Sequence, residues 1–323
     1  MSTATGGSDV QPAEYDNRDA FADELIALAR ENPRVVAVCN DSVGSSKLGG
    51  FKSEFPDRLI NVGIAEQNLV GVGAGLANGG FVPFVSGAAP FLTGRALEQI
   101  KADLAYSQYP VVLCGMSPGM AYGELGPTHH SVEDLSWLRA LPGLDVVVPA
   151  DRLETRQALR IAAAADHPTF IRVGRFKVPD VTPEGARLER GHWTTLRDGD
   201  DAAVFAIGTM VSRTLRAAEL LASEGIEVRV VNAAYVAPLD RAAIADAAAS
   251  VNALVTVEEA NISGGLGAGI AVEVAQSKRR LPMRILGVRD EFAPTGSNDN
   301  LLDYFGLTAS AISTAVREAL SDV

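Results

Sequence analysis

A single glutamate stands in a run of apolar residues and glycines. Residues 55–84 read FPDRLINVGIAEQNLVGVGAGLANGGFVPF, and Glu66 is the only glutamate among them. A carboxylate that leaves water without a partner is costly, and burial raises its pKa. Glu66 could cap a helix, because the helix dipole favours an acid in the first turn. It could also be a buried acid with a raised pKa that hydrogen-bonds a ligand's ring nitrogen. Without further context, these residues favour the helix cap.

Two further motifs contain residues that could do chemistry. In GPTHHS, residues 126–131, His129 lies in a predicted loop, where functional residues are common, although a loop histidine can also simply bond to the backbone. The adjacent histidines do not predict a zinc site, because no third ligand lies at a usable spacing. GGLGAG, residues 264–269, follows a predicted strand and opens a predicted helix, as dinucleotide-binding loops do. A lone glycine motif is weak evidence for a nucleotide site.

These motifs lie between segments that alternate in type. Short runs rich in valine and isoleucine alternate with longer amphipathic segments, which predicts parallel sheets covered by helices on both faces. The expected strands are residues 34–39, 58–63, 81–86, 110–116, 144–150, 169–174, 201–208, 226–233, 252–259 and 283–290. The expected helices are residues 18–31, 65–79, 94–107, 131–141, 152–165, 211–225, 240–250, 265–278 and 308–320.

The alternation is interrupted once, which divides the chain into two units. The segment from residue 178 to 198 is rich in proline, glycine and charged residues and predicts a linker. The predicted fold class is α/β, with two doubly wound domains of mainly parallel strands at 18–177 and 199–323. The polar residues 1–17 are expected to form a flexible tail.

Composition and charge limit the class of protein. The chain has 323 residues and a net charge of −12, which argues against a nucleic-acid-binding surface. No apolar run approaches the roughly 18 residues of a membrane helix, and the N-terminus has no signal-peptide core. Cys39 and Cys114 lie in apolar runs and are expected to be buried, reduced thiols of a cytoplasmic protein.

The motifs together resemble the transketolase family. FPDRLINVGIAEQN resembles the family's signature, and the likeness continues through GPTHHSVEDLSWLRALPGLDVVVPAD, HPTFIRVGR and VTVEEANISGGLGAGIAVEV to LGVRDEFAPTGSNDNLLDYFGLTASAI. The order of the motifs is kept over about residues 18 to 320. The resemblance implies a pyrimidine-binding domain at 18–177 and a transketolase C-terminal domain at 199–323.

The resemblance implies that thiamine diphosphate is the cofactor. Glu66 would hydrogen-bond the aminopyrimidine ring and share a proton with its nitrogen, which activates the thiazolium ring as an electron sink. With this context, the cofactor role of Glu66 replaces the helix cap as the favoured interpretation. Phe91 would stack on the pyrimidine ring. Asp41 and Ile64 would also line the cofactor pocket.

The resemblance also implies an activity and a set of substrate-binding residues. Transketolases move a two-carbon ketol unit from a ketose or ketose phosphate donor to an aldehyde acceptor. His129 matches a substrate-contacting histidine and is expected to act in catalysis together with Glu66. Arg18, Ser45 and Arg175 match the family's phosphate clamp, in which charged donors and a hydroxyl hold an anion.

Three positions depart from the family pattern. Ala88 and Gly94 stand where transketolases commonly have further aromatic residues, so the cofactor pocket should be wider or filled by a partner chain. Leu125 stands where sugar transketolases usually have an aspartate that recognises a substrate hydroxyl. The acceptor is therefore expected to lack this hydroxyl or to carry it differently.

A partner subunit is expected to complete the site. Full-length transketolases also carry a diphosphate-gripping domain, marked by GDG and a downstream asparagine that binds Mg²⁺, and no matching segment occurs here. We therefore expect no metal site in this chain and Mg²⁺ ligands on an N-terminal transketolase subunit. The resemblance is to the C-terminal half of a split, two-subunit transketolase, and the expected assembly is an α2β2 heterotetramer with its active site between chains.

Other interpretations stay open. One is a related thiamine diphosphate enzyme that uses pyruvate or another 2-oxo acid, like deoxyxylulose phosphate synthase or a dehydrogenase β subunit. Another is a regulatory subunit without catalysis, which the departures at positions 88, 94 and 125 would support. The third is a nucleotide site at GGLGAG.

Overall fold

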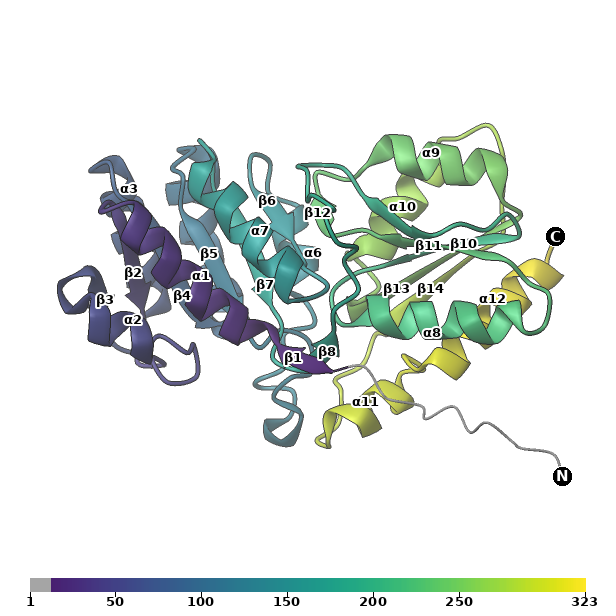
Figure 1. Cartoon of the computed structure of the whole chain (residues 1–323), viewed down its shortest axis with the longest axis horizontal. Coiled ribbons are helices and arrows are strands. Elements are labelled where there is room, and N and C mark those ends of the chain that lie inside the picture. The colour runs from purple at the N-terminus through teal and green to yellow at the C-terminus, as the bar shows by residue number, and fades with distance from the viewer. Residues whose placement is uncertain (1–12) are drawn as a thin grey trace, which may run out of the picture.

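Two sheets organise the chain, and they lie side by side in the computed structural model, which describes residues 13–323 (Figure 1). The first has seven strands in the order β12-β6-β7-β5-β4-β2-β3, and the second has five in the order β14-β13-β10-β11-β9. Neighbouring strands run parallel except for the edge strands β12 and β9. The predicted α/β fold class is confirmed.

The strands coincide closely with the predicted apolar runs. The first sheet contains β2 (Val35–Cys39), β3 (Leu59–Asn61), β4 (Val82–Ala88), β5 (Val112–Met116), β6 (Asp145–Val147), β7 (Thr169–Val173) and β12 (Tyr235–Ala237). The second contains β9 (Thr194–Arg197), β10 (Ala202–Ala206), β11 (Val228–Asn232), β13 (Ala253–Asn261) and β14 (Met283–Val288). Two short strands, β1 (Glu14–Asp16) and β8 (Lys177–Pro179), pair with each other.

Most helices also coincide with predicted segments. The α-helices are α1 (Asn17–Glu31), α2 (Gly49–Glu54), α3 (Glu66–Asn78), α4 (Ala89–Arg95), α5 (Leu97–Gln99), α6 (Asp134–Arg139), α7 (Arg152–Ala164), α8 (Met210–Ala222), α9 (Arg241–Ser250), α10 (Leu266–Ala275), α11 (Asn298–Tyr304) and α12 (Ala309–Ser321). Three short helices of other types are the 3-10 turns η1 (Pro56–Arg58) and η3 (Gly123–Leu125) and the π-helix η2 (Ile100–Tyr106).

Helices cover both faces of the first sheet because its strands are apolar on both sides. Ala37 of β2 packs in one cluster with Phe21 of α1 and Leu159 of α7. Its neighbour Val38 points to the opposite face and packs with Leu69 of α3. In Figure 1, α1 and α7 lie side by side on the near face of this sheet.

The two units share one continuous core. In the second sheet, α8 and α12 cover one face, and α9 and α10 cover the other. The cluster on the latter face also contains residues of the first unit, such as Leu138 of α6 beside Phe205 of β10. Strand β12, although it comes from the second half of the sequence, pairs with β6 of the first sheet. The joint between the units is therefore rigidly packed.

Two local predictions need correction. The flexible tail expected at residues 1–17 is wrong at its C-terminal end, because residues 14–16 form β1 and α1 begins at Asn17. The helix expected at 94–107 is instead α4, α5 and the π-helix η2, with a break at Ala96. Residues 1–12 of the predicted tail lie outside the described residues.

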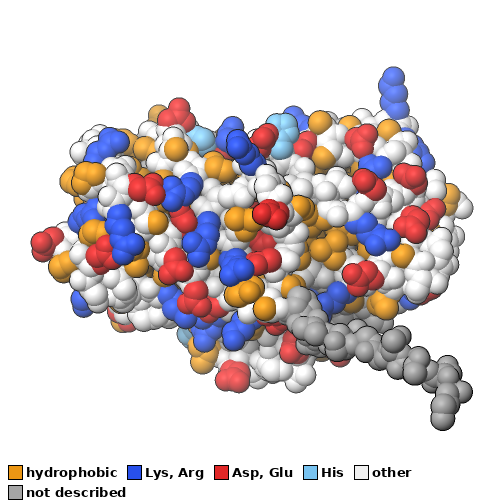
Figure 2. Space-filling view, in the orientation of Figure 1, with side chains coloured by type: hydrophobic (Ala, Val, Ile, Leu, Met, Phe, Trp, Pro, Cys, Tyr) orange, Lys and Arg blue, Asp and Glu red, His pale blue; other side chains and the backbone are white. Residues whose placement is uncertain are grey.

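The surface over α1 and α7 carries charges of both signs. Figure 2 shows basic and acidic side chains interspersed over this face. Several of them form ion pairs between the two helices, such as Arg160 with Glu31 at 2.9 Å and Arg156 with Asp23 at 3.3 Å. Within residues 13–323, none of the helices combines the length and the apolar character that crossing a membrane requires.

Candidate active site

The candidate residues gather at one edge of the seven-stranded sheet. Asp41 follows β2, Glu66 follows β3, Phe91 follows β4 and Arg175 follows β7. These strands are parallel, so their carboxyl ends meet at the same edge, where α/β proteins commonly bind ligands. His129 reaches this edge from the long loop between β5 and α6.

Glu66 is a buried residue that borders an open hollow. It is the first residue of α3 and is only 3% exposed. Asn40 donates a hydrogen bond to its Oε1 at 3.2 Å, and Nη1 of Arg95 donates to its Oε2 at 3.0 Å. The hollow has a volume of about 540 Å³, and Ile64, which is 74% exposed, forms part of its wall. Asp41 is exposed on the loop beside Asn40.

The expectation that Glu66 has a raised pKa is wrong for this structure. Burial raises the pKa of Glu66, but hydrogen bonds from its own backbone amide, Arg95 and Asn40 together outweigh burial, and the net pKa is lowered from 4.5. The carboxyl group is therefore held ionised at neutral pH. The local sequence does not indicate this shift in pKa, because Asn40 and Arg95 are 26 and 29 residues away from Glu66.

An aromatic and cationic row extends from Glu66 toward His129. The guanidinium carbon of Arg95 lies 4.2 Å from the centroid of the Phe91 ring. On the same ring, His129 packs edge-on with a centroid distance of 5.1 Å. The Nδ1 atom of His129 lies 2.9 Å from Oγ1 of Thr128. The structure therefore brings Glu66, Phe91 and His129 together, with Arg95 between them.

The row of aromatic and cationic side chains continues from His129 to Arg175 through Tyr122, which the sequence motifs did not single out. The ring of Tyr122 lies 6.1 Å from that of His129, and Arg175 approaches the same tyrosine ring at 5.3 Å. Tyr122 stands four residues before Gly126, and its position next to GPTHHS is the only sequence signal for it.

Arg18 and Ser45, the other two residues of the predicted clamp, contact each other, and both already have hydrogen-bond partners within the chain. The guanidinium of Arg18 donates to Asp16 at 2.7 Å and to the carbonyl of Ser45 at 3.2 Å. In the antiparallel pair of β1 and β8, Asp16 lies opposite Lys177. This register places Arg18 near the chain segment that carries Arg175. The charge of Arg18 is thus already balanced by Asp16. Binding of an anion there would need this pair to open or to be shared.

The loop that carries Leu125 is anchored on the second unit. Leu125 is 55% exposed. The backbone amide of Gly296 donates to the carbonyl of Gly123 at 3.0 Å. Gly126 has a φ of +74°, and a Cβ there would lie 2.6 Å from Thr295. Glycine is therefore required at position 126 by both backbone conformation and space.

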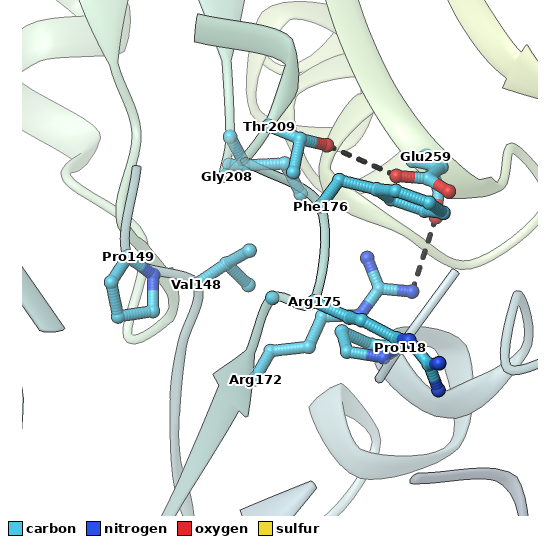
Figure 3. Close-up of a pocket in the computed structure, with 11 residues that line it drawn as sticks. Pro118, Val148, Pro149, Arg172, Arg175, Phe176, Gly208, Thr209 and Glu259 are labelled. Atoms are coloured by element: carbon cyan, nitrogen blue, oxygen red, sulfur yellow. Dashed lines mark hydrogen bonds between the residues drawn. The ribbon is translucent and has the colours of Figure 1, made fainter. Parts of the chain in front are cut away.

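A small cavity that Arg175 helps to line marks the junction of the two units (Figure 3). Its volume is about 20 Å³, enough for roughly one water molecule. Glu259 accepts hydrogen bonds from Thr209 at 3.0 Å and from the backbone amide of Met120 at 2.8 Å, and its carbonyl accepts from Arg172 at 3.1 Å. These hydrogen bonds support the end of β7, and the cavity is too small to hold a sugar.

The glycine-rich motif packs against a buried carboxylate. Glu258 is fully buried and accepts hydrogen bonds from the amides of Leu266 and Gly267, both at 2.8 Å. A Cβ at Gly265 would overlap with Oε2 of Glu258. The glycines permit close packing, and the amides at the start of α10 already have a partner within the chain. The alternative of a nucleotide site at GGLGAG is therefore not supported.

Glu258 makes stability depend on pH. Burial raises its pKa to about 7, against the amides, Arg172 and Arg139, which lower it. The native state then keeps a proton that the unfolded chain loses near pH 4.5, so stability falls as pH rises from about 4.5 to 7, by roughly 3 kcal/mol. We expect Glu258→Gln to flatten this part of the profile, measured by urea unfolding at several pH values.

The control for this prediction is Glu54, whose pKa is lowered by its hydrogen bond with Arg30. Glu54 therefore changes the free energy of unfolding only below pH 4.5. The substitution Glu54→Gln should leave the dependence of that free energy on pH unchanged between pH 4.5 and 7. An unchanged slope in Glu258→Gln would contradict the assignment. Glu154, with a pKa raised by burial to about 7, adds to the slope in the same direction and remains in both variants.

Comparison with known proteins identifies the family. The model of the transketolase pyrimidine-binding domain matches residues 13–180, and that of the transketolase C-terminal domain matches residues 191–312. The chain belongs to the transketolase family. The resemblance seen in the sequence motifs is thereby confirmed.

Individual relatives place this transketolase chain among the split members. One subunit of the apulose-4-phosphate transketolase of Phocaeicola vulgatus is 41% identical over 91% of this chain and 94% of its own length. A solved structure, the inactive β4 tetramer of a split-gene transketolase, superposes with a TM-score of 0.87 at 37% identity over 96% and 99% of the two chains. 1-Deoxy-D-xylulose-5-phosphate synthase 1 of Geobacter sulfurreducens is 37% identical over 98% of this chain but only 50% of its own length.

This transketolase chain is a transferase subunit that corresponds to the C-terminal half of a split transketolase. Its hollow is bordered by the buried Glu66 carboxylate and by Arg95, and the guanidinium of Arg95 lies over the Phe91 ring. Among the residues from 13 onward, no group of three or more His, Cys, Asp or Glu side chains could hold a metal ion.

Proposed function

We propose that this chain and a partner subunit form a thiamine diphosphate-dependent transketolase. The enzyme transfers a two-carbon ketol unit from a ketose or ketose phosphate donor to an aldehyde acceptor. The observation that carries this proposal is the buried Glu66 carboxylate, which borders the open hollow and is separated from the Phe91 ring by Arg95. In the free chain, Asn40 and Arg95 offset the burial of this carboxylate, and its place at an open hollow allows a ligand to reach it.

Each residue of the row has a distinct task in this proposal. Bound thiamine diphosphate supplies the electron sink for cleavage and formation of the carbon–carbon bond. Glu66 holds the pyrimidine ring by a hydrogen bond and exchanges a proton with its nitrogen. Phe91 gives the ring an apolar surface, and Ile64 and Asp41 border it. His129, in contact with the Phe91 ring, faces the substrate and moves a proton at its oxygen atoms.

The substrate's anionic end lies toward Arg175 in this arrangement. Arg175 is half-buried at the end of β7, and the pair of Arg18 and Ser45 lies near the same chain segment. A phosphate held there would place the carbonyl end of the substrate toward His129. Leu125 presents an apolar side chain at the rim, which favours an acceptor without a hydroxyl at that point.

The partner subunit supplies the diphosphate and Mg²⁺ sites. The tetramer built from β chains of the split-gene relative is described as inactive, which supports a need for a second kind of chain. We propose that the partner carries the GDG and asparagine ligands and that the two chains form an α2β2 heterotetramer. The exposed Ile64 at the wall of the hollow would then be covered by the partner. A cytoplasmic location stays a prediction.

The test is donor choice by the reconstituted pair. The chain would be co-purified with a candidate N-terminal subunit and supplied with thiamine diphosphate, Mg²⁺ and an aldehyde acceptor. We expect transfer of a two-carbon unit from a ketose phosphate and no release of CO₂ from pyruvate. Product would be measured by mass spectrometry with a ¹³C-labelled donor.

The alternatives predict different outcomes. Release of CO₂ from pyruvate without turnover of ketose phosphates would favour a synthase-like or dehydrogenase-like enzyme. Stable assembly and coenzyme binding without turnover of either donor would favour a regulatory subunit.

A further inference from the structure

The space beside Glu66 and Phe91 is already taken by a side chain of the same molecule. Phe91 and Arg95 are four residues apart on α4, a spacing that places both on one face of a helix. The Arg95 guanidinium donates to Oε2 of Glu66 at 3.0 Å and lies over the Phe91 ring at 4.2 Å. A planar group with N–H donors therefore binds the carboxylate and stacks on the ring simultaneously.

These are the two contacts that the proposed function assigns to the aminopyrimidine ring. That ring is also planar, also forms a hydrogen bond with Glu66 through its nitrogen and also stacks on Phe91. A guanidinium and a pyrimidine cannot lie on the same face of Phe91 and bind the same carboxylate oxygen. One of them must leave for the other to bind.

Arg95 is held loosely enough to leave. Its side chain is 51% exposed, whereas that of Glu66 is almost fully buried. Within residues 13–323, Glu66 is the only side chain that pairs with the Arg95 guanidinium. The remaining N–H groups face solvent in the open hollow, so Arg95 loses one ion pair and one ring contact when it swings out.

We propose that Arg95 is a placeholder that occupies the pyrimidine position in the free subunit and is displaced when thiamine diphosphate binds. This inference rests on the proposed function and adds a positioning and regulatory residue to it. In the free chain, Arg95 neutralises the buried Glu66 carboxylate and covers Phe91. When the ring replaces it, the carboxylate stays buried but loses a hydrogen bond that lowers its pKa, so its affinity for a proton increases.

The test compares coenzyme affinity in variants of the reconstituted pair. Isothermal titration calorimetry with thiamine diphosphate at saturating Mg²⁺ would give the Kd for the wild type and for Arg95→Ala. Because a half-exposed ion pair no longer has to be broken, we expect the variant to bind about fivefold more tightly. Equal or weaker binding by Arg95→Ala would overturn the proposal.

Arg95→Lys separates occupancy of the site from simple charge repulsion. Lysine keeps the positive charge, but its compact ammonium group cannot lie flat over the ring. The placeholder model predicts an affinity between those of the wild type and Arg95→Ala. A lysine variant that binds like the wild type, beside a tighter alanine variant, would mean that charge alone is responsible and would refute the placeholder.

Arg152 provides a matched control. It also pairs with a carboxylate, Asp180 at 2.7 Å, and lies over an aromatic ring, that of Tyr15 at 3.6 Å. Arg152→Ala should leave the Kd for thiamine diphosphate unchanged. A similar gain in this variant would show that the effect is general and would count against Arg95.

Failure of this inference can be told apart from failure of the proposed function. If the wild-type pair does not bind thiamine diphosphate, both are wrong. If the wild type binds it and Glu66→Gln weakens the binding while Arg95→Ala does not tighten it, only the placeholder is wrong.

Discussion

Glu66→Gln reduces the turnover number of the reconstituted two-chain enzyme by about 10²–10⁴-fold, the range associated with loss of a positioned proton-transfer group. The amide has nearly the same shape and still fills the site beside Asn40. It cannot carry the negative charge or exchange a proton with the pyrimidine nitrogen. The measurement is the steady-state rate with a ketose phosphate and an aldehyde at saturating coenzyme.

Two further measurements make this result specific. Size-exclusion chromatography with light scattering should show that the variant assembles with its partner as the wild type does. Glu54, which is paired with Arg30 at 2.7 Å on the surface, is the matched control, and Glu54→Gln should keep full activity. If Glu66→Gln retained a substantial part of the wild-type rate, the proton-transfer role of Glu66 would have to be abandoned.

Arg172→Met should destabilise the chain by about 3–5 kcal/mol, because removal of one partner leaves a buried charge without compensation. Arg172 is 4% exposed and binds Asp134 through two hydrogen bonds of 3.0 Å each. Asp134 is fully buried. The guanidinium also donates to the carbonyls of Ser131 and Glu259 and so joins the two units. The urea midpoint of unfolding measures the effect.

A second substitution tests the cause. Adding Asp134→Leu to Arg172→Met removes the unpaired carboxylate, and it should recover part of the lost stability. The control is Arg30→Met, which breaks the surface pair with Glu54 and should cost much less stability. An Arg172→Met protein as stable as this control would show that the junction does not depend on the buried pair.

The sequence was most informative where the signal is local. Apolar runs such as residues 110–116 predicted strands that the structure contains, because a strand buried on both faces needs continuous apolar residues. Glu66 could be singled out because a lone acid in an apolar run requires an explanation. The motif order around it indicated the transketolase family, which the comparisons confirmed.

The π-helix at residues 100–106 and strand β12 show where local pattern is insufficient. The amphipathic pattern of 94–107 predicts a helix but not its hydrogen-bond spacing. Tyr235–Ala237 looks like part of the second unit, yet it pairs with β6 of the first sheet. This strand pairing depends on how the two units pack against each other, and the residues of a short segment do not determine that packing.

The sequence by itself determined the α/β class, the family and the residue types at the site. Only the tertiary structure decided their electrostatic state. In the folded chain, Arg95 contacts both Glu66 and Phe91, and the Glu66 carboxyl stays ionised although it is buried. The backbone amides of Leu266 and Gly267 in GGLGAG donate hydrogen bonds to Glu258. The physical reason is that hydrophobic periodicity is encoded by neighbouring residues. The charge and the hydrogen bonds of a buried group are set by side chains that meet only after folding.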